Sequence, residues 1–98
     1  MKGRRLLATN RHAVFRLTPD LLLVFKPRGH REGEHAHEHR QRLRVLRGQL
    51  EMRIGKRTIV LRTDDPPFTL AAGRAHATLA LEDTWLVAES RPVMRRKT

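Results

Sequence analysis

The sequence contains no cysteine, and this absence excludes a disulfide scaffold, a cysteine-based zinc finger and thiol catalysis. Aromatic residues make up only 4% of the chain, so we expect an aliphatic core. Because cysteine is absent, the six histidines become the candidates for any metal binding or acid–base chemistry.

Long apolar runs are absent as well. The longest, Leu21–Phe25, is far shorter than the roughly 20 residues that a membrane-spanning helix needs. The apolar residues that follow the basic segment Lys2–Arg5 are too few for a signal peptide. These absences predict a soluble, cytoplasmic protein that has no membrane partner.

The length of 98 residues is that of one domain. We expect this domain to span residues 1–98, with its core at about residues 21–92 and basic, frayed ends at residues 1–5 and 95–98. A chain this small has much surface for its volume. We therefore expect a metal, a closed barrel or a partner subunit to contribute to its stability.

Glycine and proline turns divide the sequence into segments of strand length. Leu50, Met52 and Ile54 alternate with polar residues, which is typical of a strand with one buried face and makes Met52 a core residue. Gly55 and Lys56 then predict a tight hairpin. The expected strands cover residues 13–17, 21–26, 41–47, 49–54, 57–62, 68–70, 76–81 and 84–90. Short strands at regular spacing predict an all-β barrel or sandwich.

Three closely spaced histidines lie in the first half of the sequence. If a strand begins at His35, alternation places His35, His37, His39 and Gln41 on one face. This face continues into aliphatic residues, so we expect it to point inward. Imidazoles at positions i and i+2 can chelate one metal ion. His76, at the start of an apolar strand, is a candidate for a third ligand.

The spacing of these residues resembles the first motif of the cupin family. That motif is a glycine, five residues, His-x-His, three or four residues, a glutamate, six residues and a glycine. This chain has Gly29, His35, His37, Gln41 and Gly48 at those spacings, with glutamine in place of the glutamate. Every spacing in the motif is therefore kept.

The second cupin motif centres on Pro-x-Gly, two residues, a histidine, three residues and an asparagine. Gly73 and His76 keep this pattern, while Ala71 and Ala80 replace the proline and the asparagine. The resemblance covers about residues 21–92. It implies the double-stranded β-helix of cupins, an all-β jelly-roll barrel.

The resemblance also implies one divalent metal ion (Zn, Ni, Mn or Fe) held by His35, His37 and His76, with Gln41 in the position of the glutamate. Glutamine is neutral, so the charge of the ion would stay uncompensated. This favours Lewis-acid chemistry on an anionic ligand over oxygen chemistry. Alternatively, Gln41 turns away and leaves a three-histidine site with open positions.

A solvated histidine-rich loop is the other interpretation of residues 35–39, and the matching glycines favour the metal site over it. His39 is a candidate for a hydrogen-bond partner of a metal ligand or for a proton shuttle, and the alternative is that it merely lines the mouth of the barrel. His12 and His30 lie outside the pattern, and we interpret them as ordinary surface or core-edge histidines.

The chain also resembles a subgroup of small single-domain cupins, some of which act on uronate-type sugar acids. Members of this subgroup keep an acidic residue, an aromatic residue and an arginine on and just after the last strand. The aligned positions here are Ala88, Ser90 and Met94, and none of them matches. Glu89 and Arg95 are candidates for a shifted substitute.

These observations predict a metal-dependent enzyme, of lyase, isomerase or dioxygenase type, that acts on a small carboxylate-type anion. A non-catalytic sensor that uses the same pocket is the alternative. No strong general base is identified, because Glu34, Glu38 and Glu51 have outward parity and Glu89 is ambiguous.

The formal net charge of +11, with 17 arginines among the 21 basic residues, raises the question of a nucleic-acid partner. Seven arginines are candidates for one basic sheet face: Arg40, Arg42, Arg44, Arg47, Arg53, Arg57 and Arg62. Aromatic residues are few and no recognition helix is evident, so a nucleic-acid-binding protein with a vestigial metal site ranks third, after the enzyme and the sensor. The remaining interpretations of this arginine-rich face are a solvated surface and a homodimer interface. A homodimer that covers one sheet is expected, because a small barrel has exposed sheet edges.

Overall fold

The computed structural model describes residues 4–9 and 12–91, and these residues form strands, turns and loops without a helix. The strands are β1 (Arg4–Thr9), β2 (His12–Thr18), β3 (Leu21–Lys26), β4 (Arg31–His35), β5 (Arg40–Arg47), β6 (Gln49–Ile54), β7 (Arg57–Arg62), β8 (Phe68–Leu70), β9 (His76–Ala80) and β10 (Thr84–Arg91). Among the described residues, no helix is long and apolar enough to cross a membrane.

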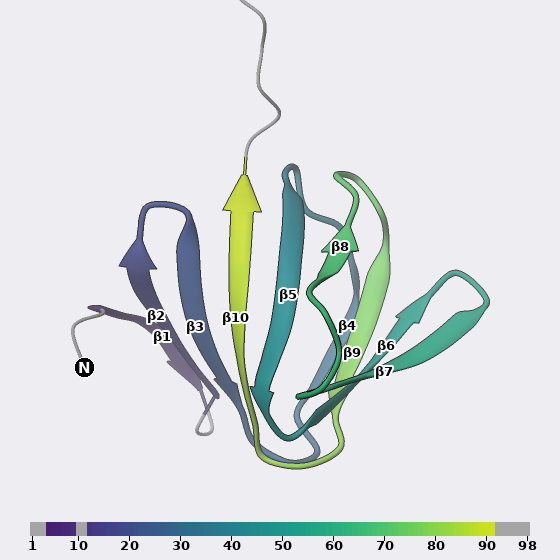
Figure 1. Ribbon diagram of the computed structural model, residues 1–98, viewed down its shortest axis with the longest axis horizontal. Coiled ribbons are helices and arrows are strands. Elements are labelled where there is room, and N and C mark those ends of the chain that lie inside the picture. Colours follow the sequence, from purple (N-terminus) through teal and green to yellow (C-terminus); the bar gives the residue numbers. More distant parts are fainter. Residues whose placement is uncertain (1–3, 10–11, 92–98) are drawn as a thin grey trace, which may run out of the picture.

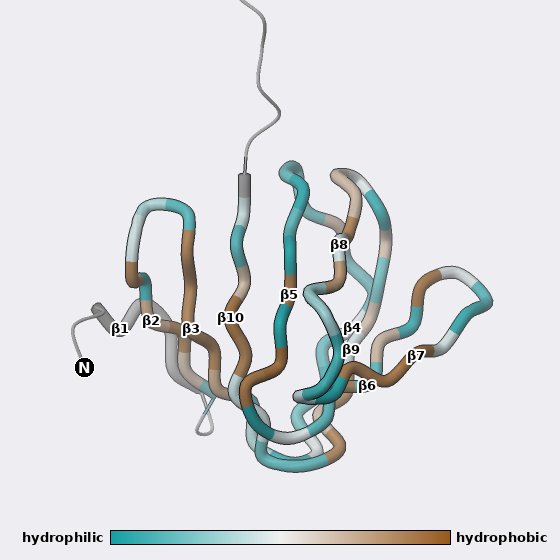
Figure 2. Tube along the Cα trace, viewed as in Figure 1, coloured by the Kyte–Doolittle hydropathy of each residue, from teal (hydrophilic) through white to brown (hydrophobic). Residues whose placement is uncertain are grey.

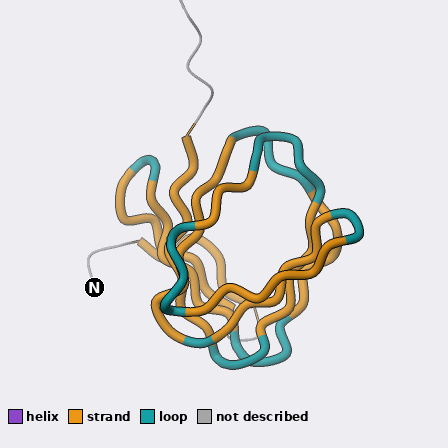
Figure 3. The backbone as a smooth tube through the Cα atoms, turned by 45° about the vertical axis from the view of Figure 1, so that its right-hand side comes forward, coloured by secondary structure: helices purple, strands orange, loops and turns teal. Residues whose placement is uncertain are grey.

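Two antiparallel sheets build the molecule. One sheet has six strands in the order β1-β2-β3-β10-β5-β8, and the other has four strands in the order β4-β9-β6-β7 (Figure 1). The sheets curve toward each other so that the strands wrap around a common centre (Figure 3). This confirms the expected all-β jelly-roll barrel.

The hydrophobic core lies between the two sheets. Figure 2 shows apolar stretches along β3, β7 and the first half of β10, and polar residues in most turns. Leu50 and Met52 are almost fully buried, at 1% and 0% exposure, which confirms the alternation expected for their strand. The other members of the buried cluster are Val24, Leu43, Val45, Leu61, Leu70, Leu86 and Ala88. As expected, the core is aliphatic.

Most of the expected strands form close to their expected bounds. The hairpin at Gly55 is confirmed, since Ile54 pairs with Arg57 and Gly55 has a φ of 61°. Strand β1 was not expected. Arg4 and Arg5 lie in it and pair with β2, so the expected fraying does not extend to them. Residues 1–3 and 92–98, which contain the other expected frayed positions, lie outside the described residues.

The prediction of one continuous strand from His35 to Val45 is wrong. Strand β4 ends at His35, a loop covers residues 36–39, and β5 begins at Arg40. The break is required because β4 belongs to the four-stranded sheet and β5 to the six-stranded sheet. The chain must therefore leave one sheet and cross to the other between these strands.

The arginines do not share one sheet face. Arg40, Arg42 and Arg44 are exposed on β5 in the six-stranded sheet. The exposed arginines at 53, 57 and 62 lie on β6 and β7 in the other sheet. The expected single basic face is therefore split between two sheets.

The outer face of the six-stranded sheet carries half-buried apolar side chains. Leu22 and Val24 point into the barrel, so Leu23 and Phe25 on the same strand point outward. Phe25 contacts Trp85 on the neighbouring strand, with ring centroids 4.9 Å apart. The homodimer expected from the sequence stays a prediction.

The turn between β5 and β6 requires glycine. Gly48 has a φ of 95°, a left-handed conformation that disfavours residues with a Cβ. A Cβ at this position would also collide with the carbonyl oxygen of Asp83 and with Thr84. Thr84 is fully buried, and its hydroxyl donates to the Gln49 carbonyl oxygen over 3.0 Å. The turn is thus packed tightly against the start of β10.

We expect Gly48→Ala to lower the free energy of unfolding by about 2–4 kcal/mol, because backbone strain and steric overlap add. Gly55→Ala is the matched control. Its φ of 61° is also positive, but a Cβ there meets no atom within 4 Å, so we expect a loss of about 1 kcal/mol. Urea unfolding of both variants measures the difference, and equal losses would contradict the role of the close packing at Gly48.

Candidate functional site

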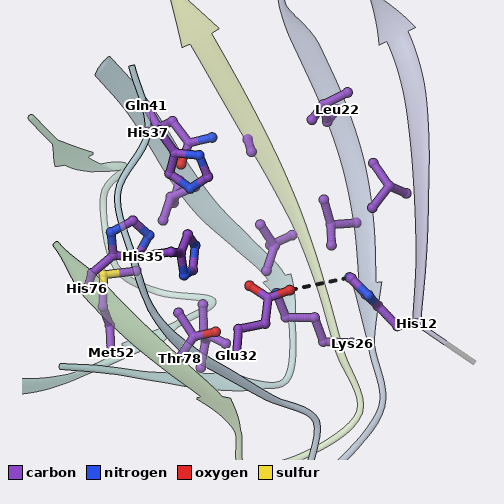
Figure 4. Close-up of a pocket in the computed structure, with 16 residues that line it drawn as sticks. His12, Leu22, Lys26, Glu32, His35, His37, Gln41, Met52, His76 and Thr78 are labelled. Carbon is purple, nitrogen blue, oxygen red and sulfur yellow. Dashed lines mark ion pairs between the residues drawn. The ribbon is translucent and has the colours of Figure 1, made fainter. Parts of the chain in front are cut away.

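A cavity of about 210 Å³ opens between the two sheets. Its volume lies below the roughly 300–1,000 Å³ of pockets that hold drug-sized ligands, so it suits a small molecule. Its apolar wall comes mainly from the six-stranded sheet, with two residues of β6 opposite, and consists of Val14, Leu22, Val24, Leu43, Leu50, Met52, Leu86 and Ala88. The remaining lining includes two groups of polar side chains, which Figure 4 shows around the cavity.

The first polar group is formed by His35, His37 and His76. Their ring centroids are 4.4–5.1 Å apart. One nitrogen from each ring lies within 4.8 Å of a nitrogen of each of the others. The structure therefore brings together the three histidines that the sequence selected as metal ligands.

Strand pairing and one loop contact hold these histidines in place. His35 at the end of β4 lies directly opposite His76 at the start of β9. His37 follows in the loop, where its carbonyl oxygen accepts a hydrogen bond of 2.8 Å from the Gly73 amide. This bond ties the loop that carries His37 to the turn that precedes His76.

Hydrogen bonds fix the tautomer of two of the rings. The Nδ1 atom of His35 lies 2.7 Å from the Gly33 carbonyl oxygen, and Nδ1 of His76 lies 2.9 Å from the Arg74 carbonyl oxygen. A carbonyl oxygen only accepts, so both Nδ1 atoms carry the proton. Nε2 of each ring is left with a free lone pair, which is the form that binds a metal.

Burial favours the neutral imidazole at two members of this group, His37 and His76. It lowers the pKa of His37 below the ordinary value, and the charges of His35 and His76 lower this pKa further. Burial also lowers the pKa of His76, although the hydrogen bond to the Arg74 carbonyl oxygen acts in the opposite direction. Neutral imidazoles do not have to release a proton before they bind a metal.

Gln41 lines the same cavity from the start of β5, and Figure 4 shows it beside His37. Its amide group could add an oxygen or nitrogen donor to the three imidazoles of the first polar group. His39, by contrast, is exposed in the loop and does not line this cavity. The inward position expected for His39 is wrong, because the strand that would have carried it is interrupted.

The second polar group was missed by the sequence analysis. Glu32 is its centre, and its Oε2 atom lies 3.0 Å from Nζ of Lys26, 3.4 Å from Nε2 of His30 and 3.8 Å from Nε2 of His12. The rings of His12 and His30 also contact each other, with centroids 4.2 Å apart. Lys26 and His12 are buried, at 6% and 7% exposure. Of the two interpretations of His12 and His30, surface or core-edge histidines, the structure supports the core-edge position, and it adds that both contact Glu32.

A β-bulge explains why Glu32 was missed. Regular alternation from His35 would turn Glu32 away from the cavity. In the structure, Glu32 pairs with Thr78 and His35 pairs with His76, so two residues of β4 lie opposite the single residue Ala77. The extra residue shifts the alternation by one position and turns both Glu32 and His35 into the cavity.

Burial by itself would raise the pKa of the Glu32 carboxyl group. The charge and hydrogen bond of Lys26, with the hydrogen bond of His30, outweigh this effect and lower the pKa below its ordinary value. Burial lowers the pKa of His12, and the Lys26 charge lowers it further. The second group therefore holds one negative and one positive charge beside a neutral His12.

The other acidic candidates stay outside the cavity. Glu34 and Glu51 line a separate outer depression, and Glu38 is exposed in the loop. Glu89 lies on the outer side of β10, 3.8 Å from Arg42. The ambiguity about Glu89 is thus resolved, because Ala88, and not Glu89, lines the cavity.

No protein-family model and no curated protein matches the sequence. Solved structures do match. The chain is similar to KdgF from Halomonas sp., with 26% identity and a TM-score of 0.74 over 97% of this chain and 91% of that one. An RmlC-like cupin from Shewanella frigidimarina has 16% identity and a TM-score of 0.75 over 96% and 87% of the two chains. This chain is a cupin by its fold.

Another similar structure is AerE from Microcystis aeruginosa, with 18% identity and a TM-score of 0.78. It matches 97% of this cupin-fold chain, which spans 48% of the AerE chain. The double-stranded β-helix is therefore common to chains of different lengths.

The cupin fold also shows what occupies the positions of the sugar-acid subgroup. Ala88, in the place of the acidic residue, presents a methyl group to the cavity. Ser90 replaces the aromatic residue two positions further along β10, and Met94 lies outside the described residues. Among the described residues of β10, those that line the cavity are Leu86 and Ala88, and neither carries a carboxylate.

The buried histidines predict that the metal-free protein loses stability as the pH falls from 7.5 to 5.5. Unfolding returns the lowered pKa values of His12, His37 and His76 to about 6.5, so the unfolded state binds more protons below that pH. The lowered pKa of Glu32 acts only near its ordinary value of 4.5, outside this range. Thermal unfolding across the range measures the effect.

His12→Gln is the control for this pH dependence, because it removes one of the buried titrating groups and keeps a neutral polar side chain. We expect its melting temperature to fall less steeply with pH than that of the unaltered protein. A melting temperature that stays constant or rises on acidification would contradict the burial of neutral histidines.

Proposed function

We propose that this cupin-fold protein holds one divalent metal ion between Nε2 of His35, His37 and His76, with Gln41 as a fourth ligand. We further propose that it acts as a metal-dependent enzyme on a small carboxylate-type anion. The observation that carries this proposal is that Nδ1 of both His35 and His76 is hydrogen-bonded to a backbone carbonyl oxygen. This bond fixes the tautomer in which the lone pair of Nε2 is free to bind a metal.

The donor set fits such an ion. Three imidazole nitrogens and one amide group suit zinc, nickel, manganese or iron better than calcium, which prefers oxygen ligands. All four side chains line one cavity, and the histidine nitrogens are already close together. The carbonyl oxygens of Gly33 and Arg74 supply the outer hydrogen bonds that usually orient metal-binding histidines.

Charge favours an anionic ligand. All four proposed ligands are neutral, so the bound ion would keep its full double charge, and the chain adds a net charge of +11. When bound, the metal would polarise a carboxylate or carbonyl oxygen as a Lewis acid. The apolar wall, including Leu86 and Ala88, would exclude water and contact the carbon atoms of the ligand.

Replacing His35 and His37 together by alanine should abolish stoichiometric metal binding, because two of the three imidazole ligands are lost. Elemental analysis and metal titration of the purified variant measure the effect. His39→Ala is the matched control, since this exposed histidine of the same loop does not line the cavity. If the double variant still binds one equivalent of metal tightly, these histidines do not form the metal site.

Gln41→Glu should weaken carboxylate binding by about tenfold, because it adds a negative charge beside the position of the ligand. Metal should stay bound, or be held more tightly. Calorimetry of the metal-loaded protein with acetate and with acetamide, its neutral analogue, measures the effect. If acetamide binds as well as acetate, or if the substitution leaves acetate binding unchanged, charge does not select the ligand.

A further inference from the structure

Two residues that line the cavity each have a buried polar atom without a hydrogen-bond partner among the described residues. These atoms are Nε2 of His12 and Oγ1 of Thr78, and both side chains are more than nine-tenths buried. A buried polar atom without a partner is costly, so such atoms usually meet a ligand or an ordered water molecule. Both atoms are outside the proposed metal-ligand set, and both residues line the cavity that Figure 4 shows.

The ion pair between Lys26 and Glu32 also has unused hydrogen-bonding capacity. Lys26, His30 and His12 all approach Oε2 of Glu32, and no described group hydrogen-bonds Oε1. The ammonium group of Lys26 has three donors, and Glu32 is its ion-pair partner in the described part of the chain. Donors and acceptors are thus left over on both members of the pair.

A second metal ion does not fit this group. Nitrogen and oxygen atoms of His12, His30 and Glu32 lie within 4.8 Å of one another, as in a metal site. The Lys26 ammonium group, however, lies 3.0 Å from the same carboxylate oxygen and already neutralises its charge. A doubly charged cation would be repelled at this short distance.

We propose that Lys26, Glu32, His12 and Thr78 form a subsite for an uncharged group that both donates and accepts hydrogen bonds, such as a hydroxyl. This inference rests on the proposed function, in which the carboxylate of the same ligand binds at His35, His37 and His76. The ligand is then a small acid whose far end carries a hydroxyl group.

Charge and hydrogen-bonding capacity select this class of group. A hydroxyl donates one hydrogen bond and accepts two, so it can donate to Oε1 of Glu32 and accept from Lys26. A second carboxylate would be repelled by Glu32, and an ammonium group would be repelled by Lys26. A methyl group would leave the polar atoms of His12 and Thr78 without partners.

Calorimetry of the metal-loaded protein tests the subsite with matched acids of three to five carbons. Each length is represented by the plain acid, its terminal hydroxy derivative and the diacid, for example butanoate, 4-hydroxybutanoate and succinate. At one length or more, the hydroxy acid should bind at least about tenfold more tightly than the other two. Acetate is too short to reach the subsite and reports on the metal end alone.

The double variant Lys26→Met/Glu32→Gln removes both charges together, so neither is left buried without its partner. The preference for the hydroxy acid should fall to within about twofold, with metal content and acetate affinity unchanged. Thr78→Val is a second variant of nearly the same shape, which removes an unpartnered hydroxyl and is expected to fold. It should weaken hydroxy-acid binding severalfold and leave acetate binding unchanged.

The proposed subsite is contradicted if no hydroxy acid binds more tightly than its plain acid, or if the preference for the hydroxy acid persists in both variants. A metal-free measurement separates this result from failure of the proposed function. Ethylene glycol should shift the imidazole ¹⁵N resonances of His12 but not of His39, and the double variant should show no shift. If metal and acetate fail to bind while His12 still responds, the metal proposal fails and the subsite stands; if His12 does not respond, the subsite fails.

Discussion

The pairing of β4 with β9 is the contact on which the rest of the site depends. It places His35 opposite His76, and Glu32 opposite Thr78, although the two strands are more than 40 residues apart in the sequence. The β-bulge between these two pairs turns both members of β4 toward the cavity. A regular strand would have directed one of them to the outside, so one extra residue gives the cavity both of its polar groups.

The two polar groups differ in how their buried polar atoms are stabilised. Burial favours the neutral form of His37 and His76, and backbone carbonyl oxygens accept the Nδ1 protons of His35 and His76. The second group instead contains an ion pair, in which Nζ of the buried Lys26 lies 3.0 Å from the Glu32 carboxylate. Between the two groups, the apolar wall lowers the local dielectric constant, which strengthens the polar interactions at both ends. One end of the cavity therefore offers imidazole lone pairs, and the other end contains an ion pair whose two charges cancel.

Much of the fold could be predicted because apolar residues alternate clearly along the long strands. Leu50 and Met52 show this alternation, and both are buried as expected. The segment Arg31–His35 contains no aliphatic or aromatic residue, so periodicity gave no signal for β4. The crossing between sheets after His35 could not be predicted either, because it depends on which sheet each strand joins. His39 was misplaced for that reason.

The sequence by itself determined the strand lengths, the aliphatic core and the spacing that selects His35, His37, Gln41 and His76, because these properties depend on local order along the chain. Tertiary structure decided which other side chains share their cavity. Closure of the two sheets brings Glu32 beside Lys26 and His12, which come from strands of the other sheet, while His30 lies two residues before Glu32 on the same segment. No periodicity could reveal that group, since the β-bulge reverses the alternation and the partners meet only when the two sheets close.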